Sequence, residues 1–333
     1  MIATSRFKPA WWLPGAHLQT LYPSLCRRRR RPELRRERLE LPDGDFLDLD
    51  WNGRRYGPIV LVLHGLEGSL ESHYTAGILA ALGAQGFRAV LMYFRGCSGE
   101  PNRLRRSYHS GDSGDLHYVI DHISRHHPHT PLAVIGYSLG GNVLLKWLGE
   151  QGRHAPVATA VAVSVPFDLD AAAVKLERGF SRIYQRHLLG KLRRSVLAKS
   201  QRLPPPVPLD ALETLTTFRA FDDAVTAPLH GFTGVHDYYA RSSSRGYLRR
   251  IAVPVLIIHA VDDPFLPASA IPDEEDLAKP VTLELSQRGG HVGFVAGNWP
   301  LRAHYWLETR ICAHLREHLQ HQQPEKPGSV PDF

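Results

Sequence analysis

The sequence predicts an α/β fold built on a mostly parallel sheet with helices on both faces. Between residues 58 and 168, short apolar runs typical of doubly buried strands alternate with amphipathic segments of helical spacing. This alternation stops at residue 169 and resumes at residue 253. Because strands that alternate with helices form parallel sheets, we expect one sheet domain interrupted by a helical insertion.

The expected elements follow in a regular order. Residues 38–51 alternate apolar and polar side chains on both sides of Pro42-Asp43-Gly44, which predicts a hairpin. Strands are expected at residues 58–65, 87–96, 131–138, 158–168, 253–264 and 281–294. Helices are expected at residues 72–86, 114–127, 139–152 and 301–319.

These elements predict four parts of the chain. Residues 1–38 form an N-terminal extension with a basic strip, and residues 39–168 with 251–320 form the sheet core. Residues 169–250 form the helical insertion, because they contain helix-like segments and a Pro-rich joint but no clear buried strand. Residues 321–333 are polar and Pro-rich, which predicts a disordered tail.

Most of the net charge of +7 lies in one strip, residues 27–38, where eight arginines less two glutamates give +6. The rest of the chain is nearly neutral, so nucleic acid is not an expected partner. Such a strip is most often a solvated face. The alternative is a surface that attracts anionic lipid or nucleic acid.

Other classes of protein are not favoured by the composition. Cys26, Cys97 and Cys312 are few and widely spaced, which predicts a reducing cytoplasm rather than a disulfide framework. The sequence has neither a signal-peptide pattern nor an apolar stretch long enough to span a bilayer. It has no Gly-rich phosphate loop and no spaced His/Cys cluster, so neither a cofactor nor a metal is expected.

Peripheral contact with a membrane stays open as a prediction. The residues that could provide it are two neighbouring tryptophans and five arginines: Trp11, Trp12, Arg27, Arg28, Arg29, Arg30 and Arg31. Packing of the two indoles on the domain is the favoured alternative.

Ser138 is the predicted nucleophile. It lies in VIGYSLGGN (134–142), where a buried strand passes directly into an amphipathic helix. A nucleophile at such a turn has a strained backbone and needs neighbours without bulk, which Gly136 and Gly140 provide. The N-terminus of the helix stabilises negative charge that develops beside the serine. The alternative is a tight turn without chemistry.

A serine hydroxyl needs a histidine base that is oriented by a carboxylate. In this architecture the acid and then the histidine follow later strands, and the two strands after the insertion end in Asp-Asp-Pro and Gly-Gly-His. Asp263 and His291 are therefore the predicted acid and base. Asp262 competes for the acid's role, but Pro264 favours Asp263 because it makes the residue before it extended.

The developing oxyanion needs two backbone donors, and the predicted pair is the N–H of Leu139 and the N–H of Leu66. His64 is expected to orient the loop that carries Leu66. Together with Tyr137 and Tyr108, His64 is also a candidate for lining the substrate pocket, with core packing as the alternative. A cysteine nucleophile at Cys97 is not favoured, because no histidine or acid occupies a supporting position.

Eight segments in order resemble the YheT-like hydrolases, which belong to the type-4 group of the α/β-hydrolase superfamily. The segments, spread between about residues 7 and 316, are FKPAWWLPGAHLQT (7–20), HGLEGS (64–69), FRGCSGEPNR (94–103), YHSGD (108–112), GYSLGGN (136–142), FDD (221–223), DDPF (262–265) and GGHVGF (289–294). The resemblance implies an α/β-hydrolase fold with an eight-stranded sheet, a helical cap and a triad at Ser138, Asp263 and His291. It also implies carboxylesterase activity and makes acyl-lipid substrates plausible.

The resulting hypothesis is a cytoplasmic serine hydrolase that cleaves a small-molecule or lipid ester through an acyl-enzyme. A thioesterase is the nearest alternative, because the same residues cleave thioesters. A catalytically weak module that holds a lipid under the cap is a second alternative, and a binder of nucleic acid or anionic membrane is a third.

Overall fold

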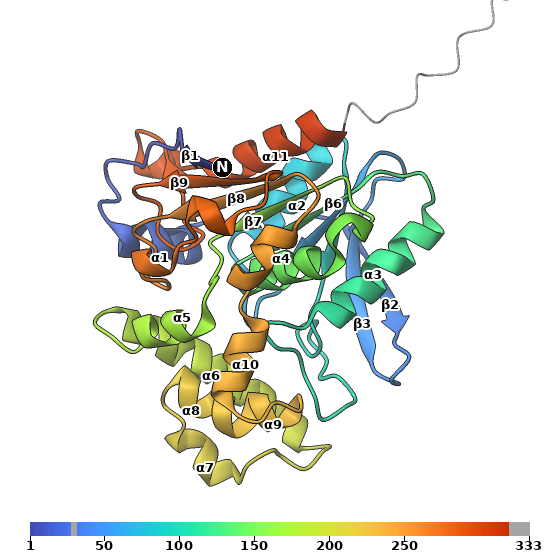
Figure 1. Cartoon of the computed structure of the whole chain (residues 1–333), viewed down its shortest axis with the longest axis vertical. Coiled ribbons are helices and arrows are strands. Elements are labelled where there is room, and N and C mark those ends of the chain that lie inside the picture. The colour runs from blue at the N-terminus through green and yellow to red at the C-terminus, as the bar shows by residue number, and fades with distance from the viewer. Residues whose placement is uncertain (28–31, 320–333) are drawn as a thin grey trace, which may run out of the picture.

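The computed structural model describes residues 1–27 and 32–319. Its main feature is a nine-stranded sheet in the order β1-β9-β8-β7-β6-β4-β5-β3-β2 (Figure 1). All neighbours from β1 to β5 in this order pair in parallel, and β3 and β2 pair antiparallel at one edge. The predicted mostly parallel sheet is confirmed. The predicted tail at 321–333 and Arg28 to Arg31 lie outside the described residues.

The core strands begin within two residues of their predicted starts but end earlier than predicted, and β9 ends at Ser286 rather than at residue 294. The central strands are fully buried because both faces are covered. The nine strands are β1 (Ile2–Thr4), β2 (Leu34–Glu40), β3 (Phe46–Asn52), β4 (Ile59–Leu63), β5 (Arg88–Met92), β6 (Leu132–Tyr137), β7 (Thr159–Val163), β8 (Val255–Ala260) and β9 (Val281–Ser286). A separate pair of two-residue strands consists of β10 (Val295–Ala296) and β11 (His304–Tyr305).

The strand that exceeds the eight expected is β1, which lies at the edge of the sheet and pairs with β9. Three residues are too short to show a period, so the sequence did not predict this strand. At the opposite edge β2 begins at Leu34, inside the predicted N-terminal extension. Residues at both ends of that predicted extension are therefore part of the sheet.

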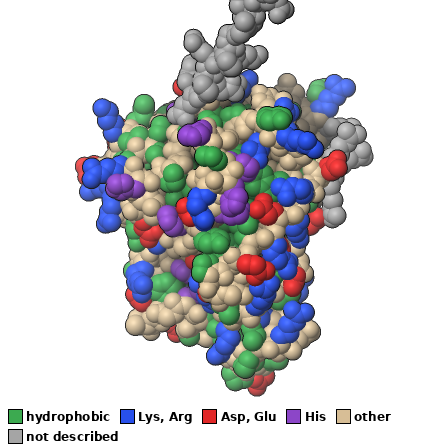
Figure 2. All heavy atoms as spheres, turned by 90° about the vertical axis from the view of Figure 1, so that its right-hand side faces the viewer, with side chains coloured by type: hydrophobic (Ala, Val, Ile, Leu, Met, Phe, Trp, Pro, Cys, Tyr) green, Lys and Arg blue, Asp and Glu red, His purple; other side chains and the backbone are tan. Residues whose placement is uncertain are grey.

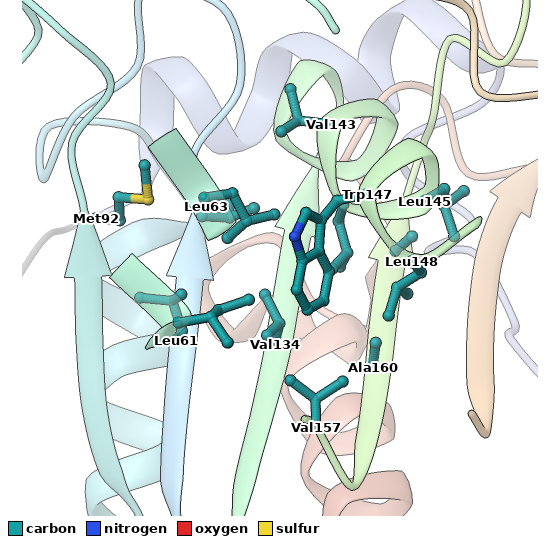
Figure 3. Packing of buried hydrophobic residues seen from close by; sticks show 14 of the residues in the cluster. Leu61, Leu63, Met92, Val134, Val143, Leu145, Trp147, Leu148, Val157 and Ala160 are labelled. Atoms are coloured by element: carbon teal, nitrogen blue, oxygen red, sulfur yellow. The ribbon is translucent and has the colours of Figure 1, made fainter. Parts of the chain in front are cut away.

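Helices cover both faces of the sheet. Helices α2 (Thr75–Ala84) and α11 (Trp306–Leu319) pack on one face, and α3 (Ser113–His126) and α4 (Leu139–Gln151) pack on the other. Successive residues of a strand serve opposite faces, as Leu61 and Val62 of β4 do. Figure 3 shows the indole of Trp147 reaching from α4 towards the sheet, beside Val134 of β6.

Residues 169–250 contain helices and turns but no strand, and they lie on one side of the sheet domain (Figure 1). The helices are α5 (Leu169–Leu176), α6 (Ser181–Ser200), α7 (Leu209–Thr214), α8 (Phe218–Phe221), α9 (Ala227–Leu229) and α10 (Val235–Ser242). A π-helical turn, Asp222–Thr226, joins α8 to α9, and a 3-10 turn, Arg245–Arg250, leads back to the sheet. This helical segment has a hydrophobic cluster of its own.

The N-terminal part adds a helix, α1 (Ala16–Cys26), beside the segment that follows β9. Further 3-10 turns are Gly152–His154, Ala268–Ala270, Glu274–Asp276 and Pro300–Arg302. Within residues 1–27 and 32–319, every helix is too short or too polar to cross a bilayer.

Two arginines in the described part of the basic strip are paired with acidic residues of the next strand. Arg36 and Arg38 of β2 form ion pairs at 2.8 Å with Asp50 and Asp48 of β3. Figure 2, which views the molecule from the right-hand side of Figure 1, shows Lys and Arg side chains spread over that face with Asp and Glu among them. Arg36 and Arg38 are therefore paired with acidic residues at a partly exposed edge of the sheet.

Helix α4 approaches the end of β4 closely, and this contact predicts the effect of one substitution. A Cβ added at Gly140 would lie 2.5 Å from the His64 carbonyl oxygen. Gly140→Ala is therefore expected to lower the free energy of unfolding by about 2 kcal/mol or more, measured by urea denaturation.

The matched control is Gly190→Ala in α6, where an added Cβ meets nothing within 4 Å. This change is expected to raise stability by about 0.5–1 kcal/mol, because alanine is the better helix former. Equal effects of the two substitutions would contradict the packing argument.

Candidate active site

Ser138 occupies the turn between β6 and α4 with a strained backbone, φ 51° and ψ −117°. Its N–H donates to the Val163 carbonyl at 2.8 Å, which ties the turn to β7. The flanking glycines are required by neighbouring backbone, since a Cβ at Gly136 would lie 2.5 Å from the Gly140 carbonyl oxygen. The close packing of this turn therefore fixes the direction of the Ser138 side chain.

The three residues predicted for the triad lie in one hydrogen-bonded row. Nε2 of His291 is 2.9 Å from Oγ of Ser138, and Nδ1 of His291 is 2.9 Å from Oδ2 of Asp263. His291 is 8% exposed and Asp263 is 2% exposed. When Nδ1 carries its proton and donates to Asp263, Nε2 is free to accept the proton of the serine hydroxyl. This geometry allows His291 to act as a base on Ser138.

The two neighbouring aspartates make different contacts. Asp263 faces the imidazole, whereas Asp262 accepts a hydrogen bond from the Gly290 N–H at 2.9 Å. Burial raises the pKa of Asp263, but the facing His291 ring, together with His259 and the Phe265 N–H, offsets burial and holds the pKa below its usual range. Burial raises the pKa of Asp262. The acid beside the imidazole is thus Asp263, the one that the proline favoured.

Helix α1 holds the loop that carries His291. The sequence did not predict this contact. The hydroxyl of Thr20 accepts a hydrogen bond from the His291 N–H at 2.9 Å, and a Cβ at Gly290 would lie 2.5 Å from the Ala16 carbonyl oxygen. The ring of Phe265 stacks on the imidazole at 3.8 Å with nearly parallel planes. No spacing rule could join Thr20 to His291, because 271 residues separate them.

The two predicted oxyanion donors lie beside Ser138. Leu139 is the first residue of α4, and a Cβ at Gly65, next to Leu66, would lie 3.2 Å from the Ser138 Cβ. Within the described part of the chain, the N–H groups of Leu66 and Leu139 donate no hydrogen bond. Both groups are therefore available to a ligand at Ser138.

His64 fixes the loop after β4. Its Nε2 accepts from the Phe94 N–H at 3.2 Å, so Nδ1 carries the proton and donates to the Gly65 carbonyl at 2.7 Å. Burial lowers the pKa of His64 to about 4, which keeps the ring neutral. His64 therefore orients the loop, as the sequence led us to expect, and does not act as a base.

Tyr108 and the cap helix α6 hold the same loop at Glu67, a residue with a positive φ of 48°. The Glu67 N–H donates to the Tyr108 hydroxyl at 2.7 Å, and that hydroxyl donates to the Glu67 carboxylate at 2.9 Å. The hydroxyl of Ser195 in α6 donates to the other carboxylate oxygen. The backbone that carries Leu66 is thus tied to the helical segment 169–250.

Ser138 and His291 open into a cavity with mostly apolar walls. The rest of its lining comes from the sheet domain and the helical segment: Leu66, Ser110, Leu139, Pro166, Leu169, Ala172, Ala173, Leu176, Leu188, Phe218, Asp222, Tyr239 and Phe265. The sequence predicted none of the residues of the helical segment as site residues. Their one signal was the FDD motif, which contains Asp222.

The prediction that His64, Tyr137 and Tyr108 line this pocket is wrong. Side chains alternate along β6, so Tyr137 points to the opposite face from the core around α4 and stacks on Tyr74 with ring centres 4.2 Å apart. His64 is fully buried beneath its loop. Tyr108 lines a neighbouring cavity together with Glu67 and Lys199.

The alternative nucleophile, Cys97, is a thiol whose pKa burial raises well above its usual range. A thiol with a raised pKa is mostly protonated at neutral pH and is a poor nucleophile. The contacts in the described chain thus favour Ser138 over Cys97.

The residues predicted to touch a membrane differ in exposure. Trp11 is 73% exposed, whereas Trp12 packs on Tyr22 and donates from its indole to the Gly297 carbonyl at 3.0 Å. Arg27 forms an ion pair with Glu308. Arg28 to Arg31 lie outside the described residues. Of the described candidates, Trp11 is the most exposed, and its indole N–H donates to the Asn298 carbonyl at 3.1 Å.

Comparison with known proteins matches this chain to a hydrolase fold family and to proteins named as ester-cleaving enzymes. A family model described as alpha/beta hydrolase fold matches residues 58–297. The "Putative esterase YheT" of Escherichia coli (strain K12) is 43% identical over 324 residues, covering 96% of this chain and 95% of that protein. "Phospholipase ABHD3" of Homo sapiens is 30% identical over 315 residues, covering 91% of this chain and 77% of that protein.

Two further matches are more distant. The "Monoacylglycerol lipase" of Saccharomyces cerevisiae is 28% identical over 285 residues, covering 83% of this chain and 62% of that protein. Among solved structures, the Pyrococcus furiosus esterase Pf2001 superposes with a TM-score of 0.57 at 16% identity, covering 86% of this chain and 93% of that one. At this identity the superposition shows a shared fold alone.

The contact between α1 and the histidine loop predicts the effect of Thr20→Val. The substitution keeps the shape of the side chain but leaves the His291 N–H without its acceptor, so the imidazole loses its fixed position. We expect about a tenfold or greater fall in kcat on an activated ester, with KM little changed. Thr214→Val, at an exposed end of α7, is the control, and an unchanged kcat for Thr20→Val would show that α1 does not position the base.

The hydroxyl of Tyr108 predicts a second effect on turnover. Tyr108→Phe leaves the Glu67 N–H without its acceptor and frees the strained backbone beside Leu66. Because an oxyanion donor acts only when correctly placed, we expect kcat to fall about tenfold. Tyr118→Phe, which loses an exposed hydrogen bond to the Glu40 carbonyl, should retain full activity. The same loss in both variants would contradict this role of Tyr108.

Proposed function

Because the chain belongs to the α/β hydrolase fold family and to its YheT-like group, we propose that it is a serine hydrolase that cleaves carboxylic esters. One observation carries the proposal: the His291 imidazole lies between Oγ of Ser138 and the Asp263 carboxylate, with 2.9 Å on each side. That is the arrangement in which a serine hydroxyl becomes a nucleophile.

The proposed reaction proceeds through an acyl-enzyme. His291 takes the proton of Ser138 as Oγ attacks the ester carbonyl, and the Leu66 and Leu139 N–H groups stabilise the oxyanion. The imidazolium then gives its proton to the departing alcohol. Water activated by His291 releases the acid and restores Ser138. Throughout, Asp263 orients the ring and stabilises its charged form.

The cavity and the relatives support lipid esters as the substrate class. The apolar side chains of Leu169, Leu176 and Phe218 face the space beside Ser138 and suit an acyl chain. Two of the similar proteins are named as a phospholipase and a monoacylglycerol lipase, which both act on lipid esters. A thioester could be attacked by the same serine, so a test of substrate class needs to include a thioester as well as esters.

We further propose that residues 169–250 act as a cap over the site, because α5, α6 and α8 contribute walls to the cavity. Trp11 is the described residue best placed to touch a membrane surface, since its indole is exposed. The cytoplasm remains the proposed compartment, since the three cysteines are free thiols.

Removal of the nucleophile tests the function. Ser138→Ala is expected to lower kcat on a p-nitrophenyl ester by at least about a thousandfold while the far-ultraviolet circular dichroism spectrum stays the same. Esters of graded acyl length and one acyl-CoA thioester, measured with the wild-type protein, rank the substrate classes.

The matched control is Ser200→Ala, at the half-buried C-terminal end of α6, which should keep wild-type turnover. Wild-type rates for Ser138→Ala would sink the mechanism. A kcat/KM for the thioester far above that for every ester would replace the esterase assignment by a thioesterase.

A further inference from the structure

Asp222 has a carboxylate that lines the same cavity as Ser138 and His291. The proposed mechanism gives this carboxylate no role. Apart from the nucleophile and its base, the polar side chains of the lining are those of Asp222, Ser110 and Tyr239. A charged group in a largely apolar wall is costly unless something pairs with it. The Asp222 carboxylate is therefore expected to pair with a hydrogen-bond donor or a cation.

The protein gives this carboxylate hydrogen bonds but no cation. Thr226 donates to Oδ1 at 2.6 Å, and the Tyr239 hydroxyl donates to Oδ2 at 2.8 Å. Among the described residues no salt bridge includes Asp222; the nearby Arg219 pairs with Asp170 at 2.6 Å instead. A carboxylate has about four acceptor positions, so two used positions leave room for a further donor.

The backbone at Asp222 is also unusual. The residue begins the π-helical turn Asp222–Thr226, and its carbonyl accepts from the Ala227 N–H, five residues on. Single π-helical turns within helices are found frequently at functional sites. Burial raises the pKa of Asp222 to about 6, which agrees with a carboxylate that lacks a positive neighbour.

We propose that Asp222 is a substrate-binding residue that accepts a hydrogen bond from a donor carried by the ester, a hydroxyl or an ammonium group. This inference rests on the proposed function and narrows its substrate class to esters with an apolar chain and one such donor. The Thr226 and Tyr239 hydroxyls hold the carboxylate in place for the donor. The aromatic ring of Phe218 also lines the cavity, and the apolar part of the ligand would pack against it.

The test measures binding separately from hydrolysis. Ligands are uncleavable N-alkyl amides of fatty acids, of graded length, that end in a methyl, hydroxymethyl or aminomethyl group on either the acyl or the amine side. Their dissociation constants are measured by calorimetry on Ser138→Ala, which is expected to bind without turnover. At the best length, a ligand with a donor should bind about tenfold more tightly than its methyl counterpart. The order of hydroxyl and ammonium then identifies the donor.

The variant that isolates the carboxylate is Asp222→Asn, in which both hydroxyl contacts can be kept because hydroxyls rotate. In the Ser138→Ala background it should bring the donor preference down to about one, since a neutral amide is the weaker acceptor. Asp223→Asn is the matched control: this neighbouring carboxylate is exposed, lies outside the cavity lining and accepts from the Val235 N–H. Its donor preference should stay as in the parent.

Turnover gives a second readout. With Ser138 intact, Asp222→Asn should lower kcat/KM for a donor-carrying ester about tenfold, mostly through KM, and leave a plain alkyl ester of the same length unchanged. Because the charge is buried without a cation, the variant should unfold at the same temperature as wild type or above it at neutral pH.

The inference is overturned if no donor-carrying ligand binds more tightly than its methyl counterpart, or if the preference survives in Asp222→Asn. Failure of the proposed function looks different. In that case the wild-type protein cleaves no ester, while the donor preference in binding, and its loss in Asp222→Asn, are still observed.

Discussion

The proposed chemistry of this protein depends on the placement of one imidazole, that of His291. Its two nitrogens face Ser138 and Asp263, which come from the ends of different strands, and neither contact survives a small shift of the ring. Phe265 fixes the plane of the ring by stacking, and Thr20 of α1 fixes its backbone. The N-terminal helix is therefore as necessary to the site as the sheet itself.

Close packing of backbone supplies the rest of the arrangement. Gly136 and Gly140 let α4 approach β4 and β6 so closely that Ser138 is held in a backbone conformation unfavourable for an L-residue. Glu67 also has a positive φ, and its N–H donates to the Tyr108 hydroxyl. Such strain costs of order 1–3 kcal/mol at each residue, and it persists because the central strands that surround these turns are fully buried.

The sequence predicted what depends on local pattern. Apolar runs predicted where the central strands lie along the chain, but not their order in the sheet. Chain order placed Ser138, Asp263 and His291 at strand ends that the parallel sheet brings to one edge. Contacts between distant segments could not be predicted, among them Thr20 with the His291 loop and β1 with β9. Tyr137 was misplaced because proximity to Ser138 in sequence outweighed the alternation of side chains along β6. The cavity lining from α5 to α10 depends on how those helices pack against one another, and the hydrophobic periodicity of each helix does not determine that packing.

The central claim is that Ser138 is activated by His291, and covalent labelling tests it most directly. The wild-type protein and His291→Ala are treated with an alkyl fluorophosphonate, and the modified residue is identified by peptide mass spectrometry with its rate of labelling. The account predicts rapid labelling of wild type at Ser138 alone and labelling at least about a hundredfold slower in His291→Ala. Labelling of another residue, or equal rates in the two proteins, would contradict it.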